Sequence, residues 1–337
     1  MTGPTVAELD FAALEDLKES LPQLAHKPLA HLSYLRAGQV EAYWLDEIAQ
    51  DLTDESSLAF VSRRSGRIDC LALCIDSPWD TEAVERRIAI VKHLAHANNA
   101  SDSKALDDLL TEVTVHAARR GVECLTCKVQ ARDTAAVCAL ERQGFLLMDT
   151  LVDLVFDSSR TPLENIRLPK RPERLRTRLA TPEDPPEILE LAHQAFANYF
   201  GRYHSDPKMP PGTGAKVYDQ WVCSGFEGWV DWTVVAEIDG KIVGYSMWKN
   251  ASALETKHCV DIAHCNFGAI HPNFSGRGVY TALKLAGMRI AESSAKHFDL
   301  ATHIANYPVH RATAKLGWRI AGARHSFHKW LSDGLPE

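Results

Sequence analysis

A short glycine-containing stretch, residues 275–281 (SGRGVYT), has the residue types of an anion-binding turn. The apolar run at 265–270 predicts a buried strand before it, and apolar residues at helical spacing over 280–294 predict a helix after it. Gly276 and Gly278 would let backbone N–H groups approach a phosphate closely, and a helix N-terminus adds partial positive charge. An ordinary strand-to-helix turn explains the same glycines, so both interpretations stay open at this point.

The strand before this turn carries a histidine that could accept a proton. His264, Asn266 and Gly268 occupy alternate positions, and alternation predicts that they share one face of the strand. A histidine titrates near neutral pH and is suited to removing a proton from an ammonium group. Asp261 is a second candidate base. A packed, hydrogen-bonded strand histidine is the structural alternative for His264.

The following residues predict the rest of the supporting elements. Residues 299–304 (DLATHI) indicate a strand, and 306–316 (NYPVHRATAKL) indicate a short helix that Gly317 would close. Residues 318–330 indicate paired strands. Asn306 stands at the start of the helix, where an asparagine is also a common cap.

The order of these elements resembles that of the GNAT superfamily of acyl-CoA-dependent N-acyltransferases, over about residues 175–331. In that family the motif Gln/Arg-x-x-Gly-x-Gly/Ala grips the pyrophosphate of coenzyme A. Here its place is taken by SGRGVY, with Ser275 replacing the usual Arg or Gln and Tyr280 replacing a small residue. A later family signature, Tyr-x-x-x-Gly-Phe, corresponds to TAKLGW, so Thr313 stands where the family often has an acidic Tyr. The resemblance implies an α/β fold (an α+β mixed sheet) with acetyl-CoA or another acyl-CoA as co-substrate.

Carried over residue by residue, the resemblance also implies site residues. A carboxylate base of the family can sit eleven residues before the pyrophosphate motif, and this position is His264 here. Asn266 would hold a water, and Thr313 can donate a hydrogen bond but is a poor acid. The implied cofactor-binding residues are Ala269, Ile270, Ser275, Gly276, Arg277, Gly278, Val279, Tyr280, Thr281 and Asn306.

The stretch 195–221 (AFANYFGRYHSDPKMPPGTGAKVYDQW) is similar to a region of sugar-nucleotide N-acetyltransferases of the dTDP-fucosamine acetyltransferase type. This similarity implies an acceptor pocket, because aromatic side chains can stack on a sugar or a base and Arg can bind phosphate. A surface loop with solvated charges is the alternative. The implied acceptor-binding residues are Tyr199, Arg202, Tyr203, His204, Tyr218 and Trp221.

The two halves of the sequence follow one plan. Residues 135–145 align with residues 308–318, and the alignment places Gly144 on Gly317. An internal duplication is the simplest explanation, and a repeat of this length predicts two similar domains rather than a solenoid.

The first of these domains, residues 1–157, is expected to be a degenerate GNAT-like copy. Its corresponding turn, residues 96–103, contains no glycine, and Asp102 would repel a phosphate. An extended linker with prolines is expected at 158–174, followed by the catalytic GNAT domain at 175–337. An unrelated α/β domain in the first half is the alternative.

The composition is that of an ordinary globular protein. The chain has 337 residues, 45% hydrophobic and 24% charged, a length that suggests two domains. The net charge of −7 argues against general nucleic-acid binding, and no apolar run approaches the roughly 18 residues of a membrane span. The first residues lack the basic and apolar regions of a signal peptide, so we expect a cytoplasmic protein.

The cysteines and histidines do not predict a metal site. Cys124 and Cys127 form a C-x-x-C inside a strand-like run, where a spacing of three points them to opposite faces. No H-E-x-x-H motif occurs, so we expect no metal. The expected partner is a small-molecule amine, with neither nucleic acid nor membrane, and a homodimer stays open.

Three functions stay open from the sequence. The first is an N-acyltransferase that moves an acetyl or other acyl group to a primary amine of a small molecule, with an amino sugar nucleotide among the candidates. The second is a GNAT-like acyl-thioester decarboxylase, which the missing Tyr makes reasonable. The third is a non-catalytic acyl-CoA-binding protein. Thioester turnover measured with and without an amine separates the first two.

Overall fold

The computed structural model describes residues 5–97, 103–197 and 199–331. The expected effect of Asp102 on a phosphate therefore concerns a residue outside the described part. The chain forms two compact units. The first unit comprises Met1–Thr150 and Gly322–Glu337, and the second comprises Leu151–Ala321.

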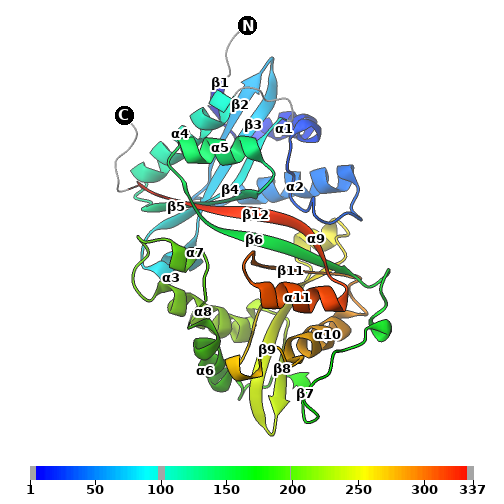
Figure 1. Ribbon diagram of the computed structural model, residues 1–337. Coiled ribbons are helices and arrows are strands. Elements are labelled where there is room, and N and C mark those ends of the chain that lie inside the picture. The colour runs from blue at the N-terminus through cyan, green and yellow to red at the C-terminus, as the bar shows by residue number, and fades with distance from the viewer. Residues whose placement is uncertain (1–4, 98–102, 198, 332–337) are drawn as a thin grey trace. The chain divides into compact units, whose positions relative to one another are not determined.

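The first unit is built on a mixed sheet with the strand order β1-β2-β3-β4-β5-β12 (Figure 1). Only β4 and β5 are parallel among the pairs described in this unit. Its strands are β1 (Thr5–Glu8), β2 (Leu58–Arg64), β3 (Arg67–Asp76), β4 (Ile88–His96), β5 (Cys124–Gln130) and the Gly322–Trp330 part of β12 (Arg319–Trp330). Its helices are α1 (Leu14–Ser20), α2 (Ala37–Asp51), α3 (Pro78–Val84), α4 (Ser103–Arg119) and α5 (Thr134–Arg142).

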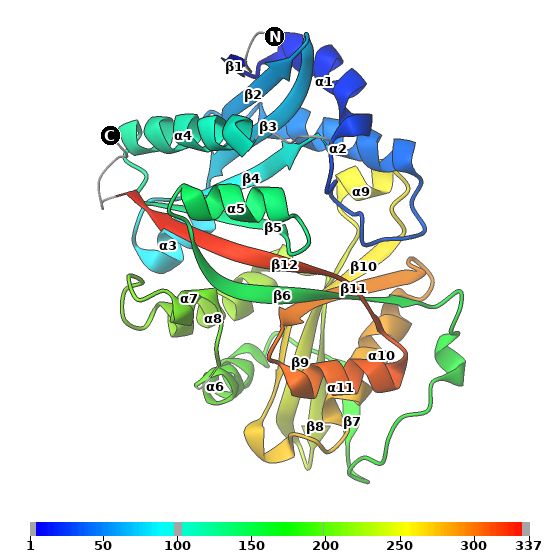
Figure 2. The same cartoon turned by 45° about the horizontal axis from the view of Figure 1, so that its top comes forward.

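Helices cover both faces of this sheet (Figure 2). In α4, Leu106, Leu109 and Val113 recur at spacings of three and four, which forms one apolar stripe. This stripe is buried with α5 against one face of the sheet. Trp44 and Ile48 of α2 pack with α1 against the other face.

The second unit has the strand order β6-β11-β10-β9-β8-β7. Its strands are the Leu151–Asp157 part of β6 (Leu146–Asp157), β7 (Arg176–Leu179), β8 (Trp232–Ile238), β9 (Lys241–Asn250), β10 (Ile262–Ile270) and β11 (His297–His303). Its helices are α6 (Pro185–Phe196), α7 (Arg202–Ser205), α8 (Thr213–Ser224), α9 (Ala253–Lys257), α10 (Val279–Ala291) and α11 (Tyr307–Leu316). Leu283 and Met288 of α10 pack with Leu316 of α11 in one core, whereas Ile188 of α6 and Val222 of α8 pack in another.

In each unit, the strand that begins the parallel pair is interrupted by a bulge. Lys92 is the extra residue of β4, and Asn266 is the extra residue of β10. A bulge bends the strand and increases its twist. Near the start of β10, Ile262–His264 pairs in parallel with His297–Asp299 of β11, and β10 then continues past the bulge to Ile270. The carboxyl ends of these two strands are therefore free to diverge.

The last strand of the first sequence half, β6, lies partly in the sheet of the second unit, and the last strand of the second half, β12, lies partly in the sheet of the first unit. Residues 318–330, predicted as paired strands, form the single strand β12, whose Arg324–Trp330 part pairs with β5. Leu151–Asp157 of β6 pairs with β11. The compact units thus differ from the predicted stretches 1–157 and 175–337. A strand joins whichever sheet edge offers it unpaired N–H and C=O groups, and a sequence repeat does not specify that edge.

No helix in the described residues is long and apolar enough to cross a membrane. Cys124 and Cys127 are buried on β5 and form no disulfide, and Cys127 packs in the core beneath α4 and α5.

Candidate active site

A cavity of about 550 Å³ lies in the second unit, where the end of β10 meets the glycine loop and α11. We call it the glycine-loop cavity. The predicted cofactor-binding residues that line it are Ala269, Ile270, Ser275, Gly276, Gly278, Tyr280, Thr281 and Asn306. The prediction missed others, among them Lys170, Phe196, Gly268, Val309, Arg311 and Lys315.

The glycine loop has the backbone conformation that only glycine adopts easily. Gly276 and Gly278 have φ angles of 75° and 80°. A Cβ atom on Gly278 would lie 3.0 Å from the carbonyl oxygen of Lys170, so this position also requires close approach of another segment. Gly278 caps α10 without a side-chain hydrogen bond. The first N–H groups of a helix have no acceptor inside the helix, so the first turn of α10 offers them to a ligand.

Positive side chains surround this cavity. Lys170, Arg311 and Lys315 contribute to its lining. Arg277, which the resemblance placed at the pyrophosphate, lies with its guanidinium 5.7 Å from the centre of the Phe274 ring and is not a lining residue. Helix N–H groups and three cations together form a site that favours a multiply charged anion.

Asn306 lines the cavity, whereas Thr313 does not. The Asn306 amide donates a hydrogen bond of 2.9 Å to Thr302 Oγ1 and does not cap α11. Thr313 is fully buried, and its hydroxyl donates to the carbonyl oxygens of Val309 (2.9 Å) and His310 (3.1 Å). Because its proton is bound inside the helix, Thr313 does not have the catalytic position that the resemblance implied.

His264 also has a different setting from the predicted one. Its Nδ1 lies 2.7 Å from Asp299 Oδ1, and its Nε2 lies 3.2 Å from Glu255 Oε1. Burial lowers the pKa of His264, but the hydrogen bonds to Asp299 and Glu255 outweigh it and raise the pKa to about 10. An imidazolium held between two carboxylates cannot accept a proton at neutral pH, and His264 does not line the cavity. We therefore correct the prediction that it is the base.

The bulge at Asn266 explains why alternation failed here. Ala263 and Cys265 pack in the core beneath α10, but Phe267 and Ala269 pack in the core beneath α6 and α8. One extra residue shifts the alternation by one position. Asn266 itself is exposed, and it does not share a strand face with His264 and Gly268 as the sequence predicts.

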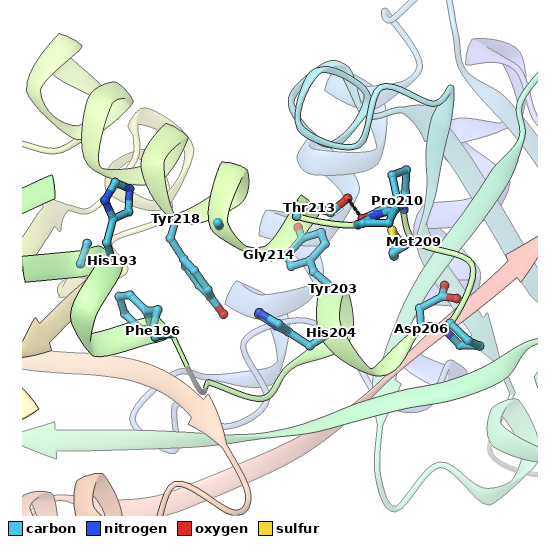
Figure 3. A pocket seen from close by; sticks show the side chains of 16 residues that line it. His193, Phe196, Tyr203, His204, Asp206, Met209, Pro210, Thr213, Gly214 and Tyr218 are labelled. Carbon is cyan, nitrogen blue, oxygen red and sulfur yellow. Dashed lines mark hydrogen bonds between the residues drawn. The ribbon is translucent and has the colours of Figure 1, made fainter. Parts of the chain in front are cut away.

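A second cavity of about 580 Å³ lies among α6, α7 and α8 (Figure 3). We call it the aromatic cavity. Phe196 lines both this cavity and the glycine-loop cavity. Its ring stacks on Tyr218 at 4.2 Å and on Phe267 at 5.1 Å. The two cavities therefore share one aromatic wall.

His204 faces into the aromatic cavity (Figure 3). Its ring lies nearly parallel to Tyr218, with centroids 5.8 Å apart. A Cβ atom on Gly214 would lie 2.2 Å from His204 Nε2, so the absence of a side chain at Gly214 makes room for the ring. Burial lowers the pKa of His204, which keeps its imidazole neutral at neutral pH.

The predicted acceptor residues divide between the two cavities. Tyr203, His204 and Tyr218 line the aromatic cavity, and Tyr199 lines the glycine-loop cavity. Arg202 stacks on the Tyr203 ring at 4.4 Å, and Trp221 meets Phe267 edge-on at 4.9 Å. Neither Arg202 nor Trp221 lines either cavity.

The sequence reasoning missed a histidine–carboxylate pair at the aromatic cavity. His193 Nε2 lies 2.6 Å from Asp219 Oδ1, and His193 is a lining residue. The pair joins α6 to α8, so its partners lie too far apart in the sequence for any local spacing to reveal them. Lys170 could have been suspected from the basic run KRPER at 170–174, which the sequence interpretation treated as linker.

No family model matches this sequence, and no curated protein matches it. Its structure is nevertheless similar to solved structures along nearly its whole length. A tandem GNAT protein from the clavulanic acid biosynthesis pathway is 13% identical with a TM-score of 0.60, over 99% of this chain and 100% of that one. The chain has the two-domain GNAT fold.

Two further solved structures have similar TM-scores. A GCN5-related N-acetyltransferase from Sphaerobacter thermophilus is 14% identical with a TM-score of 0.62, over 97% of this chain and 96% of that one. The glucosamine N-acetyltransferase region of a fungal multi-domain GH3 β-N-acetylglucosaminidase is 12% identical with a TM-score of 0.62, over 98% of this chain and 38% of that one. These likenesses confirm the predicted fold class, a mixed α/β architecture of two GNAT-like domains. At such identities they concern the fold alone.

Within the two-domain GNAT fold, the two units differ at corresponding positions. The same interval in the sequence separates Gly144 from Gly317 and Asp133 from Asn306. Both glycines have positive φ angles and follow a short helix, α5 or α11. At the start of those helices, however, Asp133 is a buried carboxylate, whereas Asn306 lines the glycine-loop cavity.

Proposed function

We propose that the second unit is an acyl-CoA-dependent N-acyltransferase that moves an acetyl or other acyl group to a primary amine of a small molecule. The glycine-loop cavity carries the proposal. It combines the N–H groups at the start of α10, which have no acceptor inside the helix, with Lys170, Arg311 and Lys315. This set suits the pyrophosphate and phosphate groups of coenzyme A. Asn306, held by Thr302, is suited to bind the amide-rich arm of the cofactor.

The reaction requires a net transfer of one proton from nitrogen to sulfur. The neutral amine attacks the thioester carbonyl carbon, the carbon–sulfur bond breaks, and an amide and a free thiol form. We assign the removal of the proton from the amine to His204, because its burial keeps the imidazole neutral. With Thr313 bonded inside α11, we assign protonation of the leaving thiolate to solvent.

We place the acceptor in the aromatic cavity. Its Phe196, Tyr203 and Tyr218 rings offer surfaces for stacking on a sugar or a base, and Phe196 leads to the glycine-loop cavity. An amino sugar, free or linked to a nucleotide, has both the amine and the flat apolar faces that such a cavity would recognise. One of the similar structures is described as a glucosamine N-acetyltransferase region, which makes amino sugars the first acceptors to test.

Calorimetric titration with acetyl-CoA tests the cofactor site. Gly276→Ala adds a methyl group at a φ of 75° in the cavity lining, and we expect it to weaken binding at least about tenfold, or 1.4 kcal/mol. Gly240→Ala is the matched control, because Gly240 has a φ of 78° and equally open space but lies in the turn between β8 and β9. Equal affinities in the two folded variants would refute the cofactor assignment.

Release of free thiol from acetyl-CoA tests the transfer. We expect turnover only when an amine is added, with amino sugars and their nucleotide conjugates as the first panel. Turnover of an acyl-CoA without any amine would replace the proposal with the thioester-cleaving alternative. Binding of acyl-CoA without turnover of any kind would leave a binding protein.

A further inference from the structure

Three residues of metal-binding types converge in the first unit. His26 precedes α2, His96 ends β4, and Asp133 precedes α5. One ligand atom from each residue lies within 4.8 Å of the other two. His96 Nε2 is 2.9 Å and His26 Nε2 is 3.8 Å from Asp133 Oδ1, and the Asp133 side chain is only 2% exposed. The cluster plays no part in the proposed acyl transfer, which we place in the second unit.

The hydrogen-bonding groups around His96 require a cation between its ring and Asp133. His96 Nδ1 lies 3.0 Å from the carbonyl oxygen of Ala97, which can only accept, so this nitrogen carries a proton. The other nitrogen, Nε2, then faces Asp133 Oδ1, which is also an acceptor. Two acceptors at 2.9 Å repel one another unless a second proton or a metal ion lies between them.

His93, on the same strand, shows what a satisfied pair looks like. Trp44 Nε1 donates to His93 Nδ1 at 3.1 Å, and His93 Nε2 lies 2.8 Å from Asp51 Oδ2. One proton on Nε2 satisfies both contacts of His93. His96 has no such arrangement, because both of its contacts are acceptors.

His26 adds a second ligand that lacks a full set of partners. Its Nδ1 is buried without a hydrogen-bond partner, and its backbone has a φ of 54°, which is uncommon for a residue other than glycine. The backbone bond from Ala25 N to His96 O, 2.8 Å long, fixes this segment beside the end of β4.

We propose that His26, His96 and Asp133 bind one divalent transition-metal ion of the zinc class. Two imidazole nitrogens and one carboxylate oxygen are a ligand set that zinc prefers, and they leave a fourth position for water or another ligand. The ion would replace the proton between His96 and Asp133. The bond from His96 Nδ1 to the Ala97 carbonyl is the outer contact that orients a ligating histidine. This proposal replaces the expectation of no metal, which rested on local sequence motifs.

Titration of the chelator-treated full-length protein tests the site. We expect calorimetry to find one Zn²⁺ per chain bound far more tightly than by other histidines, and Co²⁺ to give the visible absorption of a low-symmetry site. His26→Ala and Asp133→Asn should each weaken Zn²⁺ binding at least about 100-fold. Asparagine keeps an oxygen that can accept from Ala136 N, so Asp133→Asn leaves the cap of α5 intact.

An exposed histidine–carboxylate pair supplies the control. His116 lies 3.5 Å from Glu112 on the surface of α4, and His116→Ala should leave the tight Zn²⁺ affinity unchanged. The chain has 15 histidines, so this control separates the proposed site from weak surface binding. Zn²⁺ should raise the melting temperature of the wild type but not of His26→Ala.

Competition with protons gives an independent readout. His96 Nε2 and Asp133 Oδ1 need a proton between them when no ion is bound, so the ion must displace that proton. Affinity should rise with pH, and calorimetry in buffers of different ionisation enthalpy should detect proton release. The charged groups that act on this cluster are His26, His96, Asp133 and Arg132. Equal Zn²⁺ affinity in wild type and His26→Ala, or no tight binding at all, would show that the cluster holds only a proton.

Discussion

The two units are compared most directly at the ends of their parallel strand pairs, β4 with β5 in the first unit and β10 with β11 in the second. Both pairs are parallel, and in both the first strand carries a bulge. Counted from the bulge, His96 of the first unit corresponds to Ile270 of the second, and Asp133 corresponds to Asn306. In the second unit these positions line a cavity of about 550 Å³. In the first unit they form a hydrogen bond of 2.9 Å.

The difference teaches that the fold provides the diverging strands but the side chains at their ends decide what lies there. A neutral amide and an apolar side chain leave the end of β10 open to a ligand. A carboxylate and an imidazole attract one another at the end of β4. The segment between α1 and α2 and the segment between α6 and α8 follow the same division. His26 contacts the first pair, and His204 of α7 lines the aromatic cavity.

The middle of the same strands shows the reverse arrangement. His264 and Asp299 are paired in register in the second unit, together with Glu255. The corresponding residues of the first unit are Ile90 and Thr126, which are also paired in register. Each unit therefore holds a histidine–carboxylate group, buried in the first unit and half-buried in the second, at different levels of the sheet.

The largest expected effect tests whether chemistry belongs to the second unit alone. His204→Gln removes the proposed proton acceptor, so the rate of acyl transfer should fall about 10²–10⁴-fold while acetyl-CoA affinity stays unchanged. Because burial lowers the pKa of His204, the step in the wild-type pH profile that belongs to this group should lie below pH 6.5, separate from the protonation of the amine acceptor. Steady-state kinetics across pH measure both. His258→Gln, outside both cavities, is the control, and an unchanged rate and pH profile in His204→Gln would exclude His204.

The next prediction concerns the end of β4, where His96 and Asp133 are hydrogen-bonded. Asp133→Ala removes the carboxylate that bonds to His96 and the acceptor for Ala136 N, so we expect a loss of about 3 kcal/mol, the sum of a hydrogen bond to a charged group and a helix cap. Denaturant unfolding in the presence of a chelator measures this. Asp133→Asn should lose about 1 kcal/mol less, because it keeps the cap. A loss below 1 kcal/mol in Asp133→Ala would mean that the pair does not stabilise the first unit.

The third prediction concerns pH and the second unit. The pKa of His264 is raised to about 10, so its contribution to stability is complete below its unfolded value of 6.5 and is lost as the pH rises toward 10. We expect the wild type to lose about 1.5–3 kcal/mol over this range, the worth of a hydrogen bond to a charged group. His264→Gln should lack this component, and His116→Gln on the surface should retain it. Unfolding curves with equal pH dependence in wild type and His264→Gln would contradict the pairing.

The smallest expected effect concerns the difference between Asn306 at the start of α11 and Asp133 at the start of α5. Asn306→Ala removes an amide that lines the cavity and bonds to Thr302, but no cap of α11. We expect acetyl-CoA affinity to fall about tenfold, which corresponds to 1.4 kcal/mol, with little change in the melting temperature. A large loss of stability with unchanged acetyl-CoA affinity would show that Asn306 stabilises the start of its helix, as Asp133 does, and does not bind the cofactor.

The sequence by itself determined the features that depend on local spacing. The glycine turn between 270 and 279, the helix after it and the repeated order of elements follow from patterns that a few neighbouring residues contain. The positive φ angles of Gly276 and Gly278 are of this kind, since only glycine adopts them without strain. Most of the predicted cofactor residues line the cavity for the same reason.

Only the tertiary structure decided which distant residues meet. One bulge residue, Asn266, reverses the faces of the strand, and sequence alternation cannot reveal it. The sheet register sets Asp299 against His264 and thereby turns a predicted base into a fixed cation. The convergence of His26, His96 and Asp133 likewise depends on where a strand end and two loops lie in space. Periodicity reports the repeat of a single element, but the protonation state and the partners of a side chain depend on neighbours that other elements supply.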